Sequence, residues 1–306
     1  MASQCSCDVL LGNAGSPGCV AVHGVARKLI RVPLVANDGT ENKIDLTATL
    51  DQTFWDGLIN NADASKRYYP TPVFKTVTQE RAESITEDFD DGSTAFVRDG
   101  VKSWDGFITK GASPQLVGVL KDDRCTSFGV LIVDDCGNLI GRDIGDGFLY
   151  PIPVDNGSWN PIWTEPTDTT VSKVNLTFNF STIFQDENLG FIEASATGTD
   201  LLNSNGGLLD VVFSNEAAAS TTEASFDVAY IYGPSNSKLP ITGLLPAEIV
   251  LYNVTQDAAV ATALAPESPD GTYTVTFLAQ TSADVIRISI LKNGIDPDDS
   301  TTVTIP

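Results

Sequence analysis

The chain contains few of the residues on which most enzyme active sites depend. Its 306 residues include one histidine and one methionine, and lysine and arginine together number 18. A single imidazole, at His23, excludes most general-base arrangements built on histidine. Motifs of the types Gly-x-Ser-x-Gly, Walker phosphate loop and His-Glu-x-x-His are also absent. We therefore predict that the protein is not an enzyme and has neither catalytic residues nor a bound cofactor.

Positive charge is scarce in both halves of the chain. The formal net charge is −22, with 15 basic and 29 acidic residues in positions 1–212 and 3 basic and 11 acidic residues in positions 213–306. No segment offers the basic footprint of a nucleic-acid-binding protein, and adhesion to an anionic membrane is disfavoured for the same reason. Two interpretations of the acidity stay open: solubility at high concentration, or a surface that repels nucleic acid.

Long hydrophobic runs are missing as well. No stretch approaches the roughly 18 apolar residues of a membrane-spanning helix. The first residues, MASQCSCDVL, lack a basic region followed by an apolar run, so no export signal is predicted. The five cysteines are an odd number, which together with the missing signal predicts synthesis in a reducing cytoplasm.

Four residues near the N-terminus have the side chains of a closed zinc site: Cys5, Cys7, Cys19 and His23. Their spacing differs from that of zinc knuckles, because Cys-x-Cys does not give the turn that Cys-x-x-Cys gives. No second thiol pair follows at a matching distance. We therefore predict no metal site, and favour thiols at a chain end that become ordered against a neighbouring subunit. Zinc binding and a disulfide formed after release from the cell remain the alternatives.

Adjacent acidic residues are frequent and stand mostly beside glycine or arginine in predicted turns. The pairs are Asp90-Asp91, Asp122-Asp123 and Asp134-Asp135, and a further cluster is Asp296-Pro297-Asp298-Asp299. We interpret them as solvated turn carboxylates. A carboxylate pair for hydrolysis and weak binding of a divalent ion are the alternatives, although the last cluster lacks the spaced ligands and central glycine of an EF-hand loop.

The residues that are present favour strands. Apolar residues make up 42% of the chain, with Val, Ile, Phe and Leu prominent, and alternating runs such as TVSKVNLTFNF recur. The triplet DDG at 90–92 predicts a hairpin turn, and FGVLIVDDCGNLIG predicts a strand over 128–133, a turn at 135–138 and a return strand. One short helix is expected within residues 45–59. The predicted class is antiparallel all-β.

Composition divides the chain into four parts. Residues 1–25 contain Gly, Asn, Ser and Pro without a regular apolar pattern and predict an extended arm, and residues 26–212 predict the main β domain. The small, polar segment 213–223 predicts a linker. Residues 224–306 predict an immunoglobulin-like sandwich without cysteine, because strands recur about every ten residues. Within it, Tyr230 and Tyr232 share the parity of core positions, with contact to sugars as the alternative.

Several motifs in residues 1–212 resemble a family of virion proteins from tailed phages of Bacteroidota. They are GNAGSPGC followed by VARKLIRVPLVANDG, DASKRYYPTPVFKTV, ERAESITEDFDDGSTAFVRDGVKSWDGFI, VDDCGNLIG and TDTTVSKVNLTFNF. The size, all-β character and hairpin layout look similar to tail tube proteins. The motifs KLPITGLLPAEIVLYN and DGTYTVTFLAQ resemble the immunoglobulin-like modules often appended to virion proteins.

This resemblance implies a structural role and an antiparallel sandwich or barrel of tail-tube type. Copies would form rings, commonly hexameric, that stack into a tube in the virion tail, after assembly in the cytoplasm of a host bacterium. Residues 1–25 would reach a neighbouring ring, and the hairpin at Asp90-Asp91-Gly92 would form lumen wall or a stacking contact. DNA would pass an acidic bore without specific binding.

The partners implied are other tail proteins such as sheath, terminator or baseplate, with no membrane contact. The alternatives are another virion component, namely a baseplate or neck ring or a capsid decoration protein, and a surface adhesin or glycan-binding protein. The absence of an export signal disfavours the last of these, because an adhesin must cross a membrane.

Overall fold

A computed structural model describes residues 23–234, 236–264, 267 and 269–306. Strands dominate this part of the chain, and the strand pairs in its sheets are antiparallel, which confirms the all-β class. The chain divides into two compact units. Unit 1 contains the residues through Gln52 and Pro70–Asn205, and unit 2 contains Thr53–Tyr69 and Gly206–Pro306.

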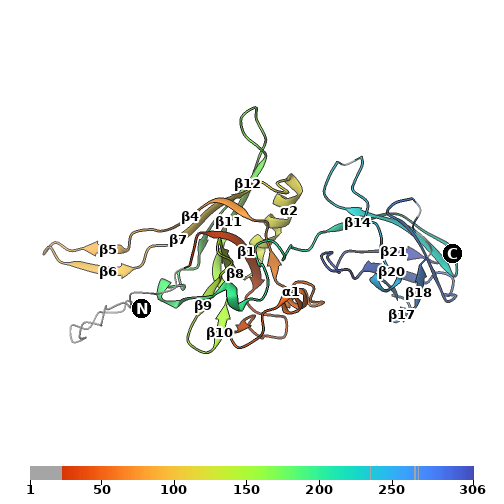
Figure 1. The fold of residues 1–306 in the computed structure, drawn as a ribbon, viewed down its shortest axis with the longest axis horizontal. Helices are drawn as coiled ribbons and strands as arrows, with labels where there is room; N and C mark the ends of the chain where they lie inside the picture. The colour runs from red at the N-terminus through yellow and green to blue at the C-terminus, as the bar shows by residue number, and fades with distance from the viewer. Residues whose placement is uncertain (1–22, 235, 265–266, 268) are drawn as a thin grey trace. The chain divides into compact units, whose positions relative to one another are not determined.

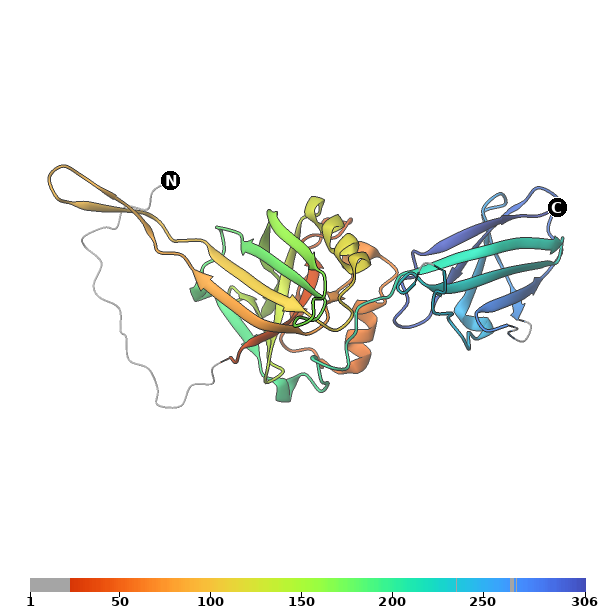
Figure 2. The same ribbon diagram turned by 90° about the horizontal axis from the view of Figure 1, so that it is seen from above.

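Unit 1 is built on one large sheet with a two-stranded hairpin attached (Figures 1 and 2). Its strands are β1 (Ala26–Pro33), β2 (Ile44–Asp45), β4 (Phe74–Arg81), β5 (Ile85–Asp88), β6 (Thr94–Arg98), β7 (Lys102–Ile108), β8 (Phe128–Asp134), β9 (Leu139–Asp143), β10 (Phe148–Tyr150), β11 (Ile152–Thr164), β12 (Lys173–Phe180) and β13 (Leu189–Ile192). The path through the large sheet is β2-β10-β9-β8-β11-β12-β7-β4, with β1 also paired to β8 and β13 to β9. The two-residue strand β3 (Tyr69–Pro70) lies where the two units meet in the sequence.

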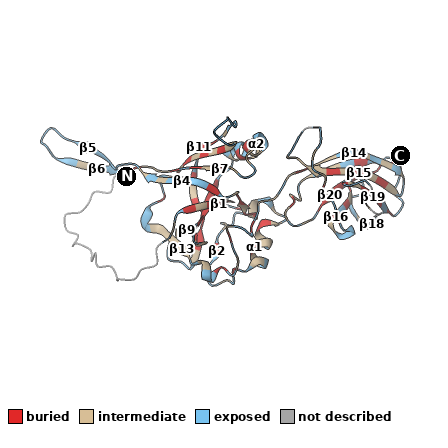
Figure 3. Ribbon diagram, turned by 45° about the horizontal axis from the view of Figure 1, so that its top comes forward, coloured by how far each residue is buried: buried red, intermediate tan, exposed pale blue. Residues whose placement is uncertain are grey.

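The centre of unit 1 is β8, all seven residues of which are buried. It pairs with β1 along its length, from Ala26 opposite Asp134 to Pro33 opposite Phe128. A strand buried on both faces is expected to be a nearly continuous apolar run, and FGVLIV has that composition. In Figure 3 the strands of the large sheet carry most of the buried positions of the unit.

The main core of unit 1 lies on one face of this sheet. Strand β12 shows why: its residues alternate strictly between buried and half-buried positions, so one face of the strand faces the core. The core joins aromatic and aliphatic side chains of seven strands and one helix, among them Trp104, Trp159, Phe178, Phe180 and Leu120. Strand β11 bends at an irregularity between Asp155 and Asn160, and so pairs with β8 at its start and with β12 along the rest.

The helix of that core is α2 (Pro114–Asp122), which the sequence analysis missed. Ser113 caps it by accepting a hydrogen bond from the Leu116 backbone amide, and Pro114 occupies its first turn. Val117 and Leu120, three positions apart, turn its apolar face to the core. The prediction of a single helix is therefore wrong. Neither α-helix of the described chain has the length of apolar sequence needed to cross a bilayer.

The other face of β1 and β8 covers a buried lysine. Lys28 is almost fully enclosed, and its Nζ donates to the carbonyl oxygens of Leu201 (2.8 Å), Leu202 (3.1 Å) and Asn205. Burial lowers the pKa of Lys28 to about 8, with Asp200 opposing the change. The three carbonyls give the ammonium group its hydrogen bonds, so Lys28 ties residues 201–205 to β1.

Unit 2 contains eight strands in two four-stranded sheets. They are β14 (Val211–Ser220), β15 (Glu223–Tyr230), β16 (Ile249–Asn253), β17 (Ala258–Val260), β18 (Thr262–Leu264), β19 (Thr272–Phe277), β20 (Val285–Ile290) and β21 (Ser300–Thr304). The sheet orders are β14-β15-β19-β18 and β17-β16-β20-β21. Lettered A to G along the chain, with C′ after C, these orders are ABED and C′CFG, the arrangement of the immunoglobulin fold. The two sheets share one apolar core, so the predicted immunoglobulin-like sandwich is confirmed.

Two predicted boundaries of this unit are wrong. Residues 213–223, expected as a linker, lie mostly in β14, which pairs with β15 from Val211 opposite Tyr230 to Ser220 opposite Glu223. The second error concerns α1 (Gln52–Ile59), the helix expected within residues 45–59. Together with the short 3-10 helix η1 (Ala64–Lys66), most of it belongs to unit 2 and not to a continuous domain 26–212. The remaining 3-10 helices are η2 (Asp123–Cys125), η3 (Asp186–Asn188), η4 (Ala194–Ala196) and η5 (Pro246–Glu248).

Candidate functional site

The most prominent feature of unit 1 is the hairpin of β5 and β6, which extends the β4–β7 pair away from the large sheet (Figures 1 and 2). The predicted turn at 90–92 is confirmed. The Phe89 amide donates to the Ser93 carbonyl (2.8 Å) and the Gly92 amide to the Phe89 carbonyl (2.9 Å). Gly92 has φ of +79°, a conformation that glycine adopts without strain.

The hairpin has no core of its own. Its sheet has two strands, and four large apolar side chains on it are between 43 and 50% exposed: Ile85, Phe89, Phe96 and Val97. Figure 3 shows the hairpin coloured largely as exposed. An isolated two-stranded hairpin is marginally stable in water, and apolar side chains grouped on such an element are typical of a contact surface. The hairpin is therefore the candidate functional site of unit 1.

The hairpin is also strongly acidic. Residues 83–99 contain six acidic residues and one arginine. At the tip, Asp91 Oδ1 accepts hydrogen bonds from the side chain (2.6 Å) and the amide (2.9 Å) of Ser93. These two bonds lower the pKa of Asp91. The tip sequence Glu87-Asp88-Phe89-Asp90-Asp91 thus presents one aromatic ring between four carboxylates.

Charged side chains hold the base of the hairpin. Asp186, in η3, binds Arg81 Nε of β4 (2.6 Å) and Lys102 Nζ of β7 (3.0 Å). The pKa of Asp186 falls to about 2, mainly through the hydrogen bond from Arg81, which outweighs the effect of partial burial, with Lys102 adding to the decrease. Arg81 also donates to the Gly100 carbonyl (2.8 Å). We call Arg81, Lys102 and Asp186 the hairpin clamp. The sequence analysis did not find it because its members are far apart in the chain.

Gly100 allows the two strands to approach each other at the clamp. A Cβ atom at this position would lie 1.8 Å from the carbonyl oxygen of Ala82 and 2.3 Å from its carbonyl carbon. Both atoms are backbone, so no side chain can move aside. Any residue other than glycine would separate β4 from β7 where the hairpin begins.

The N-terminal thiols proposed as zinc ligands, Cys5, Cys7 and Cys19, lie outside the described residues. His23 is described and exposed, with its Nδ1 3.3 Å from the carbonyl oxygen of Gly24. The other two cysteines, Cys125 and Cys136, are both exposed and free.

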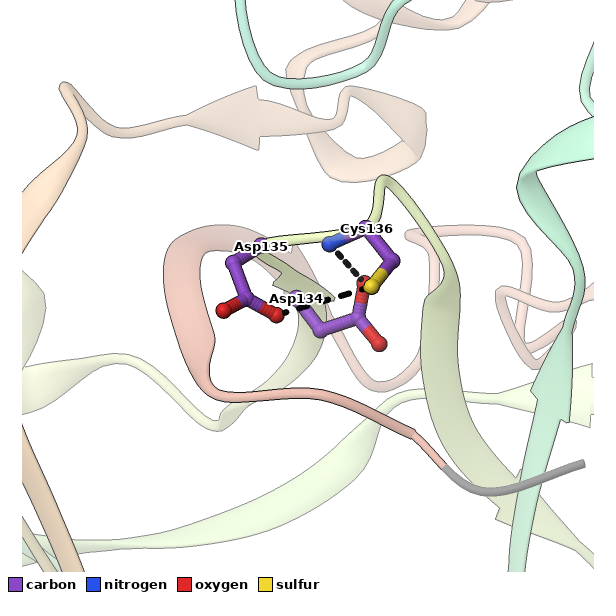
Figure 4. Close-up of side chains that lie close together, drawn as sticks. All are labelled: Asp134, Asp135 and Cys136. Carbon is purple, nitrogen blue, oxygen red and sulfur yellow. Dashed lines mark hydrogen bonds between the residues drawn. The ribbon is translucent and has the colours of Figure 1, made fainter.

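One group of possible metal ligands does come together in the described part of the chain: Asp134, Asp135 and Cys136 (Figure 4). Its central carboxylate is already satisfied. Asp134 accepts hydrogen bonds from the amides of Gly24 (2.6 Å), Cys136 (2.9 Å) and Asn138 (2.8 Å) and from the Asn138 side chain (2.8 Å). Burial opposes ionisation of Asp134, but these bonds outweigh it and lower its pKa. The group closes the turn after β8.

Cys136 is a poor ligand in this setting. Its thiol lies 3.8 Å from Asp135 Oδ1. Desolvation and the two neighbouring carboxylates raise the pKa of the Cys136 thiol. Because the thiolate is the form that binds metals and attacks electrophiles, the arrangement disfavours both activities.

The other acidic clusters are engaged within the fold. Asp123 pairs with Arg31; burial raises the pKa of Asp123, and Arg31 opposes that change. In unit 2, Asp296 Oδ1 and Asp298 Oδ2 bind Arg67 Nη1 at 3.1 and 2.9 Å. Asp299 Oδ2 accepts a hydrogen bond from the Val211 amide at 2.6 Å. The cluster that was considered above for a divalent ion therefore binds the buried guanidinium of Arg67 and the start of β14.

Both tyrosines considered for contact with sugars, Tyr230 and Tyr232, are half-buried. Tyr230 is half-buried and packs against the core of unit 2, as its parity with Phe226 and Val228 predicts. Tyr232, beyond the end of β15, is also half-buried.

No protein-family model matches the chain, and no curated protein matches it in sequence.

Proposed function

We propose that the protein is a structural subunit of a tailed-phage particle and works by associating with copies of itself, most specifically as the subunit of the tail tube. The observation that carries this proposal is the β5–β6 hairpin, which exposes four large apolar side chains and whose two strands pair with no third strand in the part of the chain that the structure describes. Such a surface is stabilised when another chain covers it.

A second open surface supports the same proposal. In the described chain, β4 ends the path of the large sheet and is hydrogen-bonded to β7 only. A strand at the edge of a sheet presents unpaired amides and carbonyls to a further strand. When copies arrange in a ring, pairing between their edge strands removes these unpaired groups.

The charge of the chain is consistent with a channel for DNA. Residues 1–212 carry a net charge of −14 from 15 basic and 29 acidic residues. Phosphates passing such a surface meet few cations that would hold them, so DNA slides without specific binding. In this proposal the rings, hexameric in the family that the sequence resembles, stack in the virion tail and contact sheath, terminator or baseplate proteins.

Microscopy of the purified full-length chain tests the proposal. We expect long tubes in negative stain and a fast, concentration-dependent boundary in sedimentation velocity. Isolated single rings would support a neck or baseplate component in place of a tube. A chain that stays monomeric at every concentration and salt tested would contradict the proposed role.

The matched variant replaces residues 83–100 by Asn-Gly. Ala82 and Val101 are already hydrogen-bonded across this point (3.0 Å), and Asn-Gly closes a two-residue hairpin. We expect this variant to fold and to lose assembly. Assembly equal to that of the unaltered chain would show that the hairpin does not carry the association.

A further inference from the structure

A shallow groove on unit 1 lies between α2 and β11. It has a volume of about 440 Å³ and is lined by Pro114, Val117, Lys121, Arg124, Asn160, Pro161, Ile162 and Trp163. The lining is mostly apolar, and Ile162 remains 49% exposed. Half-buried Trp163 is fixed by its Nε1, which donates to the hydroxyl of Ser172 at 2.8 Å.

Two cations stand in this groove. Lys121 and Arg124 are exposed, and neither forms an ion pair with any residue that the structure describes. Arg124 is oriented by hydrogen bonds that Nε donates to the Trp159 carbonyl (2.8 Å) and Nη2 donates to Asn160 Oδ1 (2.9 Å). Its Nη1 has no hydrogen-bond partner among the residues that the structure describes. In a chain of net charge −22, two unneutralised cations beside apolar side chains are an unusual combination.

The second hollow of unit 1, at the base of the hairpin, also contains cations. Asp186 binds Arg81 and Lys102 there, and exposed Arg98 forms no ion pair in the described chain. That hollow is lined in part by the hairpin itself, whereas the lining of the groove between α2 and β11 contains no hairpin residue.

The chain itself carries a segment of complementary chemistry. The hairpin tip presents Phe89, 47% exposed, between Glu87-Asp88 and Asp90-Asp91. An exposed ring fits an apolar groove, and carboxylates on both sides of it fit the two cations. We propose that the hairpin tip of one copy docks in the groove between α2 and β11 of a second copy, with Phe89 against the apolar lining and Asp90 near Lys121.

This contact has a direct consequence for assembly. The tip and the groove are different surfaces of the same chain, so each copy still offers a free tip or a free groove after pairing. Such head-to-tail contacts close into rings or continue as filaments, whereas a two-fold dimer uses one surface twice. The inference rests on the proposed self-association and adds the surfaces that mediate it.

Charge exchange tests the docking. The side chains of Asp90 and Lys121 form no hydrogen bond or ion pair in the described chain, so Asp90→Lys and Lys121→Glu alter charge and leave the fold intact. We expect each variant to weaken association about tenfold in sedimentation velocity, because like charges then face each other. The double variant restores attraction and should return to within about threefold of the unaltered chain.

Control variants carry the same charge changes elsewhere on unit 1. Lys110 and Asp168 are exposed and lie outside the groove and the hairpin. We expect the variants Lys110→Glu and Asp168→Lys to associate like the unaltered chain. A carbodiimide should also link Lys121 to Asp90 or Asp91 between chains, identified by mass spectrometry in a mixture of nitrogen-14 and nitrogen-15 protein.

The possible failures are distinguishable. Normal assembly with Lys121→Glu, or two weakened single variants that the double variant does not restore, would overturn the docking and leave the proposed function standing. A chain that never associates would overturn both.

Discussion

Two glycines of unit 1 respond in opposite ways to the same added methyl group. At Gly100 a Cβ atom would lie 1.8 Å from the Ala82 carbonyl oxygen, whereas at Gly118, inside α2, nothing lies within 4 Å of it. We expect Gly100→Ala to lower the free energy of unfolding of unit 1 by about 2 kcal/mol or more, because β4 and β7 must separate. Urea titrations followed by tryptophan fluorescence measure the effect.

Gly118→Ala is the control for that substitution. It removes a glycine from a helix interior, which stabilises by about 0.5–1 kcal/mol. Equal unfolding free energies for the two variants would show that the backbone approach at Gly100 does not matter to the fold.

At the scale of elements, Asp186 of η3 links β4 to β7 and gives the hairpin clamp a pH dependence. The pKa of Asp186, about 2, lies below the value of about 3.9 for an unfolded aspartate. The ionised carboxylate therefore contributes its full stabilisation of the folded state above pH 4. That stabilisation is lost as the pH falls from about 4 towards 2. Because the carboxylate is half exposed, we expect Asp186→Asn to cost about 0.5–1 kcal/mol at pH 7.

The measurement is the difference in unfolding free energy between the unaltered chain and Asp186→Asn, taken at pH 7, 5, 4 and 3. The difference should shrink only below pH 4. Asp168→Asn, in an exposed loop, should show no such trend. A difference that stays constant down to pH 3 would contradict the role given to this carboxylate.

Some elements could be predicted from local patterns and others could not. The period of two in residues 173–180 predicted β12, and the DDG triplet predicted the hairpin turn. Helix α2 was missed because its apolar residues form a short run over 116–120 that Gly118 interrupts, although Ser113-Pro114 is a capping signal. Strand β14 was taken for a linker because its Ala and Ser residues have low strand propensity. It forms because β15 completes its hydrogen bonds and Phe213 and Ala218 pack on the core.

At the scale of the whole molecule, one buried arginine joins parts of unit 2 that are distant in sequence. Arg67 is 1% exposed; besides Asp296 and Asp298, it donates to the carbonyls of Asn61 (2.5 Å) and Ala62 (3.3 Å). We expect Arg67→Met to destabilise unit 2 by about 3 kcal/mol, because it leaves a partly buried carboxylate without its partner. Hydrogen exchange of the unit 2 amides reports this change without interference from unit 1.

Arg287→Met provides the comparison within the same unit. Arg287 is exposed, and its guanidinium lies 5.2 Å from the centre of the Tyr252 ring without an ion pair in the described chain, so its loss should cost less than about 1 kcal/mol. If the unit 2 amides exchanged hydrogen at the same rates in both variants, the packing of residues 53–69 on the sandwich would not depend on Arg67.

The sequence by itself determined the all-β class, the hairpin at 90–92 and the sandwich strands β15, β16, β19, β20 and β21, because alternation and turn residues act over a few neighbouring positions. The tertiary structure decided which distant residues meet. It joined Asp186 to Arg81 and Lys102, Arg67 to Asp296, and Lys28 to the carbonyls of residues 201–205. These contacts depend on the path of the whole chain. Lys28 and Arg67 are buried, and a buried charge must find a partner once water is excluded.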